Sequence, residues 1–166
     1  MIYLLDSNIF ITAANTFYSF DFGMNFWDFL KEQAENNKLA SIDKVLDELN
    51  RCDNRLKEWA NNNFLNYFLP AKKIEVIQKY SELMKWAESK NNHYTTNAID
   101  EFMKEDNADP WLIAFALSKR EDYLIVTFEK FNKEQKNKIP IPNVCKDFKL
   151  ETFDLYQMLK DLKFKF

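Results

Sequence analysis

The sequence predicts an α/β fold, a three-layer α/β/α sandwich with a mostly parallel central sheet. Two observations support this prediction. Short, wholly apolar runs at residues 2–5 and 123–127 are typical of strands that are buried on both faces. Segments with helical spacing of apolar residues alternate with these runs, which is the order expected when helices connect parallel strands. Because the 166 residues show no linker and no break in composition, we expect a single domain over residues 1–166.

The elements follow in chain order from their apolar patterns. A strand at 2–5 and a second short strand at 39–42 flank a helix at 25–36. A helix-rich middle, between 43 and 117, is an elaboration inserted into the sandwich. The remaining expected elements are helices at 43–59, 71–90 and 95–105, a strand at 123–127, a short strand near 148–150 and, with Thr152 as its cap, a final helix at 153–162.

Two details of the helical middle bear on function. Asp109 and Pro110 are expected to open a very apolar helix, because Asp is favoured at the N-cap and Pro at the first helical position. In the helix that begins at 43, the apolar side chains average to one direction when each residue turns about 100°. Asp47 lies roughly 165° from that direction and points to water, whereas Glu48 lies roughly 95° from it and borders the core.

The scarce residue types exclude several kinds of catalytic site. With Gly23 as its one glycine, the chain cannot form the glycine-rich loops that wrap phosphates in nucleotide-binding motifs. His93 is the one histidine, and Cys52 and Cys145 lie far apart, which disfavours zinc, haem and thiol redox chemistry. Carboxylates are plentiful, at 26 Asp plus Glu, so an enzyme of this composition is expected to use oxygen ligands and a hard cation.

The N-terminal residues and the charge restrict where the chain is expected to act. The first residues carry no basic region and their apolar run ends at Asp6, so no secretory signal is expected. No segment approaches the roughly 20 apolar residues of a membrane span, and two cysteines suit a reducing cytoplasm. The net charge of -3 does not itself indicate nucleic-acid binding, although residues 119–166 carry 11 Lys and Arg against 8 Asp and Glu.

Four acidic residues occupy positions at which an α/β sheet presents a site. Asp6 follows the first strand, and Glu129 lies two residues beyond the last long apolar run. Ligands of parallel sheets bind at the carboxyl ends of the strands. Glu48 borders the core on its helix, and Asp109 begins the most apolar helix. Each residue also has an ordinary structural explanation, as a turn residue, a helix-border residue, an N-cap or a first-turn acid.

The four acids are more informative as a set than singly. Uncompensated carboxylates in one pocket repel and raise one another's pKa. A bound divalent cation would remove that conflict. We therefore expect a site for Mg²⁺ or Mn²⁺ built from Asp6, Glu48, Asp109 and Glu129.

The local patterns around these acids resemble the PIN domain. The resemblance covers essentially the whole chain and rests on four segments in this order, Leu4-Leu5-Asp6-Ser7-Asn8, Val45-Leu46-Asp47-Glu48-Leu49, Asp109-Pro110-Trp111-Leu112-Ile113-Ala114 and Val126-Thr127-Phe128-Glu129. The chain is most similar to a PIN-like subfamily catalogued without an assigned function. Its members share segments read here as Tyr18-Ser19-Phe20-Asp21, Phe26-Trp27-Asp28 and Ile141-Pro142-Asn143-Val144-Cys145.

This resemblance implies an activity and its partners. PIN domains are metal-dependent ribonucleases with a parallel α/β/α sheet, and many are the toxins of toxin-antitoxin pairs. The resemblance therefore implies an endoribonuclease that hydrolyses RNA phosphodiester bonds with Mg²⁺ or Mn²⁺. It also implies a cognate antitoxin protein of a type II system as a partner and, because toxins of this kind often dimerise, a homodimer.

The resemblance also assigns roles to individual residues. Asp6, Glu48 and Asp109 match the three core acids of the family, and Glu129 stands at the fourth position, where Asp is usual. The longer side chain of Glu129 favours a water-mediated contact with the metal. Small polar residues that orient ligands or water are matched by Ser7, Asn8 and Thr127.

Contacts with RNA are expected from two sets of residues. The basic residues that flank the proposed edge of the sheet are Lys119, Arg120, Lys130 and Lys133. Aromatic residues near the N-terminus could stack unpaired bases, although helical spacing of the last two also suits the core; they are Phe17, Tyr18, Phe22, Phe26 and Trp27.

Two other classes of function stay open. A phosphatase with an aspartyl nucleophile also begins with an acid after its first strand, but it needs a second Asp two residues after Asp6, where this chain has Asn8. A PIN-like scaffold whose site has drifted would bind RNA or a partner protein without cleaving. Glu129 in place of the usual Asp agrees with such drift.

Overall fold

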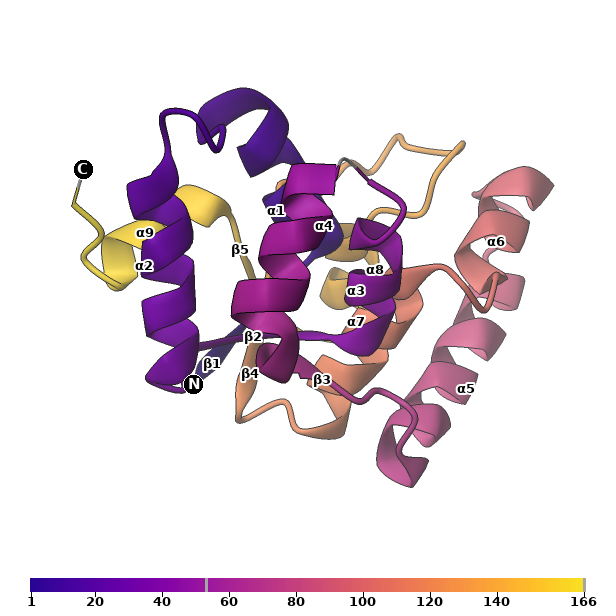
Figure 1. The fold of residues 1–166 in the computed structure, drawn as a ribbon. Coiled ribbons are helices and arrows are strands. Elements are labelled where there is room, and N and C mark those ends of the chain that lie inside the picture. Colours follow the sequence, from indigo (N-terminus) through magenta and orange to yellow (C-terminus); the bar gives the residue numbers. More distant parts are fainter. Residues whose placement is uncertain (53, 166) are drawn as a thin grey trace.

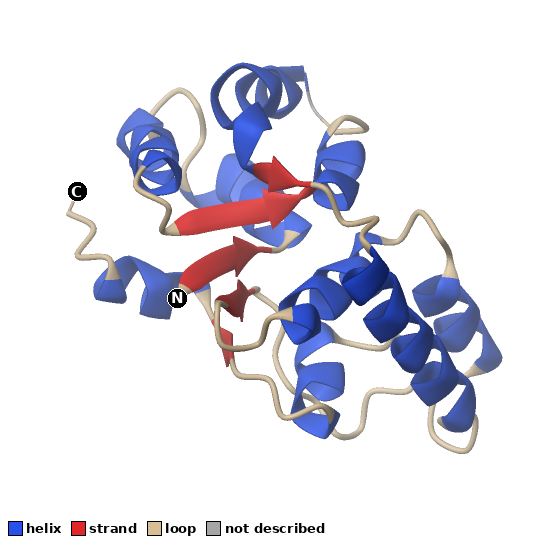
Figure 2. Cartoon of the chain, turned by 90° about the horizontal axis from the view of Figure 1, so that it is seen from below, coloured by secondary structure: helices blue, strands red, loops and turns tan. Residues whose placement is uncertain are grey.

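The computed structural model describes residues 1–52 and 54–165, which form a parallel sheet between layers of helices. Within these residues the sheet has five strands in the order β3-β2-β1-β4-β5, and each neighbouring pair is parallel. Figure 2 shows helices on both sides of the strands, which confirms the predicted three-layer sandwich. The strands are β1 (Ile2–Leu5), β2 (Leu39–Ile42), β3 (Phe68–Leu69), β4 (Tyr123–Val126) and β5 (Thr152–Phe153).

The register brings the ends of the central strands to one edge. Leu5, the last residue of β1, pairs with Val126, the last residue of β4, and Val126 pairs in turn with Phe153 of β5. The backbone continues this alignment past the strands, because Asp6 N donates to Val126 O at 3.0 Å. The residues that follow β1 and β4 therefore begin side by side.

Helices fill the connections between the strands (Figure 1). Two of them, α5 and α6, lie together at one end of the molecule and pack against α7, so the helix-rich elaboration predicted between 43 and 117 is confirmed. The helices are α1 (Ser7–Thr12), α2 (Met24–Glu35), α3 (Asp43–Leu49), α4 (Asn54–Trp59), α5 (Ile74–Ser89), α6 (Thr96–Met103), α7 (Ala108–Ser118), α8 (Ile141–Asp147) and α9 (Leu155–Asp161). Irregular turns complete the set, with π-helical η1 (Ala13–Phe17) and η2 (Ala60–Phe64) and the 3-10 turn η3 (Leu65–Tyr67).

Several predicted bounds in the middle of the chain are wrong. The single helix expected at 43–59 is broken, because α3 ends at Leu49 in a turn in which Arg51 N donates to Glu48 O. The helix α7 begins two residues earlier than expected, and its N-cap is Asn107, whose side chain accepts from Asp109 N at 3.0 Å. Asp109 therefore lies inside the first turn and is not the cap.

The C-terminal third also differs from the prediction. The strand expected near 148–150 is instead the end of the unpredicted helix α8, where Lys149 has a φ of 56° and Leu150 N donates to Cys145 O at 2.8 Å. The strand of this region is β5, which begins at Thr152, four residues after the expected start. The final helix, α9, is capped by Asp154 in a reciprocal capping box with Gln157, so Thr152 is not its cap.

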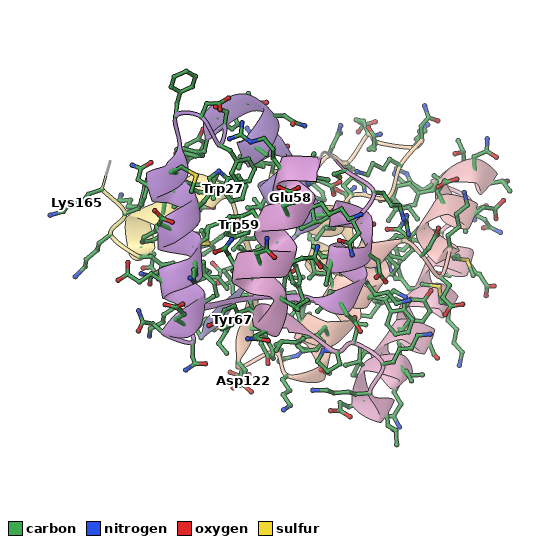
Figure 3. All side chains as sticks on the ribbon, viewed as in Figure 1. Trp27, Glu58, Trp59, Tyr67, Asp122 and Lys165 are labelled. Atoms are coloured by element: carbon green, nitrogen blue, oxygen red, sulfur yellow. The ribbon has the colours of Figure 1, made fainter. Side chains whose placement is uncertain are left out.

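Aromatic side chains form much of the core. Trp27 of α2 and Trp59 of α4 pack edge to face, with ring centroids 4.8 Å apart (Figure 3). The indole of Trp27 also donates to the carbonyl of Tyr18 at 2.7 Å. Of the aromatic residues considered for stacking on bases, Tyr18, Phe26 and Trp27 are buried in this core, and the exposed ones are Phe17 and Phe22. Among the described residues, no helix combines the length and apolar character that crossing a membrane requires.

Candidate active site

Asp6 lies at the carboxyl end of β1, where the chain turns into α1. Its extended backbone makes it the N-cap of that helix, and its side chain is only 2% exposed. Two hydroxyl groups donate to the carboxylate: Thr127 Oγ1 to Oδ2 at 2.9 Å, and Ser7 Oγ to Oδ1 at 3.3 Å. The buried carboxylate is therefore held in one orientation.

A small network ties the ends of β1 and β4 together. The Thr127 hydroxyl accepts from Asn8 Nδ2 at 3.2 Å and from the backbone N–H of Glu129 at 3.0 Å. Because both contacts use its lone pairs, its proton is directed to Asp6. The Asn8 carbonyl oxygen in turn accepts from Phe128 N at 3.1 Å. The structure thus joins Ser7, Asn8 and Thr127 around Asp6.

Asp109 and Glu48 meet at the start of α7. Since Asn107 caps this helix, the Asp109 carboxylate is not used as a cap, and it accepts no hydrogen bond from residues 1–52 or 54–165. Glu48 lies on α3 with a half-buried side chain, as its position beside the apolar face predicted, and the neighbouring Asp47 is exposed. Glu48 Oε1 accepts from the backbone N–H of Ala108 at 3.0 Å, which places a negative charge at the positive end of α7.

Glu129 is fixed on both of its carboxylate oxygens. Oε2 accepts from the backbone N–H of Ile141, the first residue of α8, at 2.7 Å. Oε1 accepts from the ammonium of Lys138, which forms an ion pair with Glu129. The Glu129 side chain is only 13% exposed, whereas that of Lys138 is 56% exposed. Glu129 lies in a loop, so its explanation as a first-turn helical acid is wrong.

Sequence reasoning missed Lys138. The residue lies in the loop of residues 127–140, which has no apolar periodicity, and its contact with Glu129 arises only because the loop folds back onto the start of α8. A lysine nine positions after an acid carries no pattern that would reveal this contact. Helix α8 was itself unpredicted, so the residue that anchors the loop could not be identified from the sequence.

The acids lie close enough for their charges to raise the pKa of Asp6 and of Asp109. Burial, followed by the charge of Glu129, raises the pKa of the Asp6 carboxyl to about 7. Burial, followed by the charges of Asp6 and Glu129, raises the pKa of Asp109 well above its usual range. Burial alone would lower the pKa of Lys138, but its hydrogen bond and charge pairing with Glu129 raise it. The Lys138 ammonium therefore lies beside one buried and two half-buried acids.

The side chains of Asp6, Glu48, Asp109 and Glu129 are together called the carboxylate cluster. The chemistry of its oxygen ligands suits a hard divalent cation. All of its candidate ligands are carboxylate oxygens, which Mg²⁺ and Mn²⁺ prefer, and positive charge would offset both the burial and the repulsion that raise the Asp6 and Asp109 pKa values. Within the described residues, no three Asp, Glu, His or Cys side chains converge tightly enough to hold an ion as they stand. The carboxylates of Glu48 and Glu129 each accept a hydrogen bond from a backbone N–H at the start of a helix. In the described residues, the carboxylates of Asp6 and Asp109 cap no helix by such a bond.

A cavity opens beside this cluster. It has a volume of about 300 Å³, and its lining includes Asp109, Lys138, Asn107 and Phe102. The basic residues predicted to flank the edge divide into two groups. Lys119 and Arg120 lie in the turn that enters β4, at the opposite edge of the sheet from Thr127, so their predicted placement is wrong. Lys130 and Lys133 follow β4 and lie in the loop that carries Glu129.

Comparisons with known proteins agree with the geometry of the fold. Residues 3–166 match the family model described as "Domain of unknown function (DUF4411)". No curated protein sequence matches the chain. The chain is similar in structure to a chain in the crystal structure of VapBC2 from Rickettsia felis bound to a DNA fragment from their promoter, at 19% identity, with 93% of this chain and 98% of that chain covered and a TM-score of 0.55. This likeness supports the PIN-like fold that the sequence predicted.

Proposed function

The chain belongs to the DUF4411 family, and from its PIN-like fold and its carboxylate cluster we propose that it is a metal-dependent endoribonuclease. One observation carries the proposal: burial raises the pKa of Asp6 and of Asp109, which come from two different elements, and the charge of the buried Asp6 further raises the pKa of the half-buried Asp109. A protein that buries such charges loses stability unless a cation or a proton neutralises them. The resemblance of the sequence to the PIN domain implies a catalytic metal at this position.

In this proposal Asp6 and Asp109 hold Mg²⁺ or Mn²⁺, and Glu48 and Glu129 complete the site directly or through water. The ion, when bound, would lower the pKa of a water molecule and neutralise charge on the scissile phosphate. Thr127 and Ser7 keep the Asp6 oxygens in place by donating to them. Glu48 positions Asp109 by anchoring the first turn of α7.

Lys138 acts on the same site through Glu129. Its ammonium holds one Glu129 oxygen while the Ile141 N–H holds the other, so the carboxylate stays at the mouth of the cluster. More than half of the Lys138 side chain is exposed, so the ammonium is accessible to a phosphate oxygen of an incoming RNA. Lys138 is thus both a counter-ion for the acids and a contact for substrate.

We further propose that the chain is the toxin of a type II toxin-antitoxin pair, with a cognate antitoxin protein as its partner. The likeness to a chain of VapBC2, whose crystal structure contains a promoter DNA fragment, supports a partner of this kind. A homodimer and a cytoplasmic location belong to the same proposal. Co-expression with the adjacent gene product, followed by purification of a stable complex, tests the partnership.

One observation favours a second candidate, a PIN-like scaffold that binds without cleaving. The ion pair between Lys138 and Glu129 supplies a permanent positive charge where the fourth acid of an active site would contact an ion. If the site has drifted in this way, RNA or a partner protein would still bind, but no cation would be needed. The two candidates differ in their dependence on metal.

The proposed activity is tested by incubating purified protein and RNA with Mn²⁺ or with EDTA. We expect cleavage only with Mn²⁺, and a loss of about 100-fold or more in Asp6→Asn and in Asp109→Asn. Asp47→Asn is the matched control, because this carboxylate lies next to Glu48 on α3 but is exposed, and it should cleave like the wild type. Cleavage that persists in EDTA or in both site variants contradicts the mechanism.

A further inference from the structure

A second cavity, with a volume of about 400 Å³, is lined by aromatic rings and basic side chains outside the carboxylate cluster. Its walls come from the end of α5, the turn before α6, the start and end of α8, and the same loop of residues 127–140 that carries Glu129 and Lys138. Residues 131–136 of the loop face this cavity, and residues 137–139 face the cavity beside Asp109. The loop of residues 127–140 therefore lines both cavities.

Aromatic rings from α5, from the turn before α6 and from the loop of residues 127–140 line this cavity. Trp86 and Tyr94 form one wall, with ring centroids 6.4 Å apart, and Phe131 is 47% exposed. Lys146 lies over the Phe131 ring, with its Nζ 4.1 Å from the centroid. An exposed ring next to an ammonium is the combination that binds a base by stacking and the adjoining phosphate by charge.

The charge of the lining favours an anion. Asp147 is already satisfied, because it accepts from Lys90 Nζ at 2.7 Å and from Trp86 Nε1 at 3.0 Å. Lys133 and Lys136 also line the cavity, and neither forms an ion pair with a residue in the described part of the chain. Glu134 is the other acid of the lining. The cavity thus keeps basic groups available for a phosphate.

The first turn of α8, which contains Asn143, connects the cavity to the carboxylate cluster. Its side chain is 7% exposed, and its amide donates to Tyr94 Oη at 3.1 Å and to Asn132 O at 2.8 Å, while its oxygen accepts from Asn132 N at 3.0 Å. Two residues earlier, the Ile141 N–H binds Glu129. The first turn of α8 therefore fixes the position of the loop at the cavity and at the acids together.

We propose that this cavity is a nucleotide subsite that binds one unpaired base and its phosphate from a single RNA strand whose neighbouring phosphates reach the carboxylate cluster. The inference rests on the proposed ribonuclease function and names the substrate as single-stranded in this region. A duplex does not fit, because a base must leave its stack to enter between Trp86 and Phe131. Lys133 and Lys136 contact the phosphates of the bound segment.

Binding without cleavage tests this inference. A fluorescein-labelled single-stranded oligoribonucleotide is titrated with protein in EDTA, and its anisotropy is recorded. We expect binding to weaken about tenfold in Phe131→Ala and in the double variant Lys133→Ala/Lys136→Ala. The matched control is Lys38→Ala/Lys119→Ala, which removes the same charge from exposed residues that precede β2 and β4, at the opposite edge of the sheet. The control should weaken binding less than about twofold.

An NMR measurement places the ligand and separates an RNA strand from a free nucleotide. The Trp86 indole N–H gives one of four tryptophan signals and lies in the cavity wall, whereas Trp27, Trp59 and Trp111 are buried elsewhere. We expect the oligoribonucleotide to shift the Trp86 signal at concentrations at least about tenfold below those needed with a mononucleotide. Equal potency of the mononucleotide would overturn the assignment to a strand and identify a free-nucleotide site instead.

The outcomes separate this inference from the proposed activity. Equal weakening in the cavity and control variants, or no weakening in either, overturns the subsite even if the protein cleaves RNA with Mn²⁺. Selective weakening in the cavity variants, with a shifted Trp86 signal, supports the subsite even if no cleavage is found. In that case the proposed nuclease fails and the binding surface stands.

Discussion

Lys138 pairs with Glu129 at the mouth of the carboxylate cluster, and Ile141 N–H holds the other oxygen of the same carboxylate. Lys138 also lies close enough to Asp109 and Asp6 for their charges to raise its pKa. Its ammonium therefore places a positive charge beside the half-buried Glu129 and Asp109. The first prediction follows from this arrangement.

Lys138→Met removes the ammonium but keeps an apolar stem of similar length. We expect the variant to bind Mn²⁺ about tenfold more tightly, because the cation no longer competes with a fixed positive charge. In EDTA the same variant should be less stable, since the acids lose their counter-ion. Isothermal titration calorimetry and thermal unfolding measure the two effects. Lys130→Met, in the same loop, is the control, and equal Mn²⁺ affinities in wild type and Lys138→Met would contradict the role.

The stability of the metal-free protein should depend on pH through Asp6. Its pKa is raised from 3.8 to about 7, so between about pH 4 and pH 7 the folded state keeps a proton that the unfolded chain has lost. The free energy of unfolding must therefore fall as pH rises through this range. The raised pKa of Asp109 contributes a change of the same sign. Chemical denaturation in EDTA measures this free energy. We expect Asp6→Asn to flatten the profile and Mn²⁺ to restore stability near pH 7. A wild-type profile that rises over this range would contradict the raised pKa of Asp6.

The hydroxyl of Thr127 should be needed to hold Asp6 in place. Thr127→Val keeps the shape of the side chain but removes the donor to Asp6 and the acceptor for Asn8 and the Glu129 N–H. We expect a loss of about 2 kcal/mol in unfolding free energy and a weaker affinity for Mn²⁺. Thr127→Ser restores the hydroxyl and should recover the affinity. Equal Mn²⁺ affinity in the Val and Ser variants would show that the hydroxyl has no positioning role.

The fold could be predicted from the sequence where elements are long or wholly apolar. The strands β1 and β2 lie at their predicted bounds, because a run of four apolar or small residues is typical of a strand buried on both faces. The strands β3 and β5 are two residues long and carry no such pattern. They form because neighbouring strands supply partners, which only the folded chain reveals.

Some residues of the candidate site could likewise be predicted from the sequence, and others could not. Asp6 could be placed because a buried strand ends directly before it, and Glu48 because the helical direction of its neighbours put it beside the core. The role of Asp109 at the N-cap was wrong, since Asn107 two positions earlier offers an equally good cap and takes that place. Lys138 and Asn143 depend on how an aperiodic loop folds onto α8, and local sequence contains no record of that contact.

We propose above all that Asp6 and Asp109 bind a divalent cation. Anomalous diffraction from crystals soaked in MnCl₂ tests it most directly, because Mn²⁺ scatters anomalously and no metal identity has to be assumed. We expect an anomalous peak in contact with the Asp6 and Asp109 carboxylates, which disappears in crystals of Asp6→Asn. Ordered Asp6 and Asp109 side chains with no peak between them at saturating MnCl₂ would contradict the account.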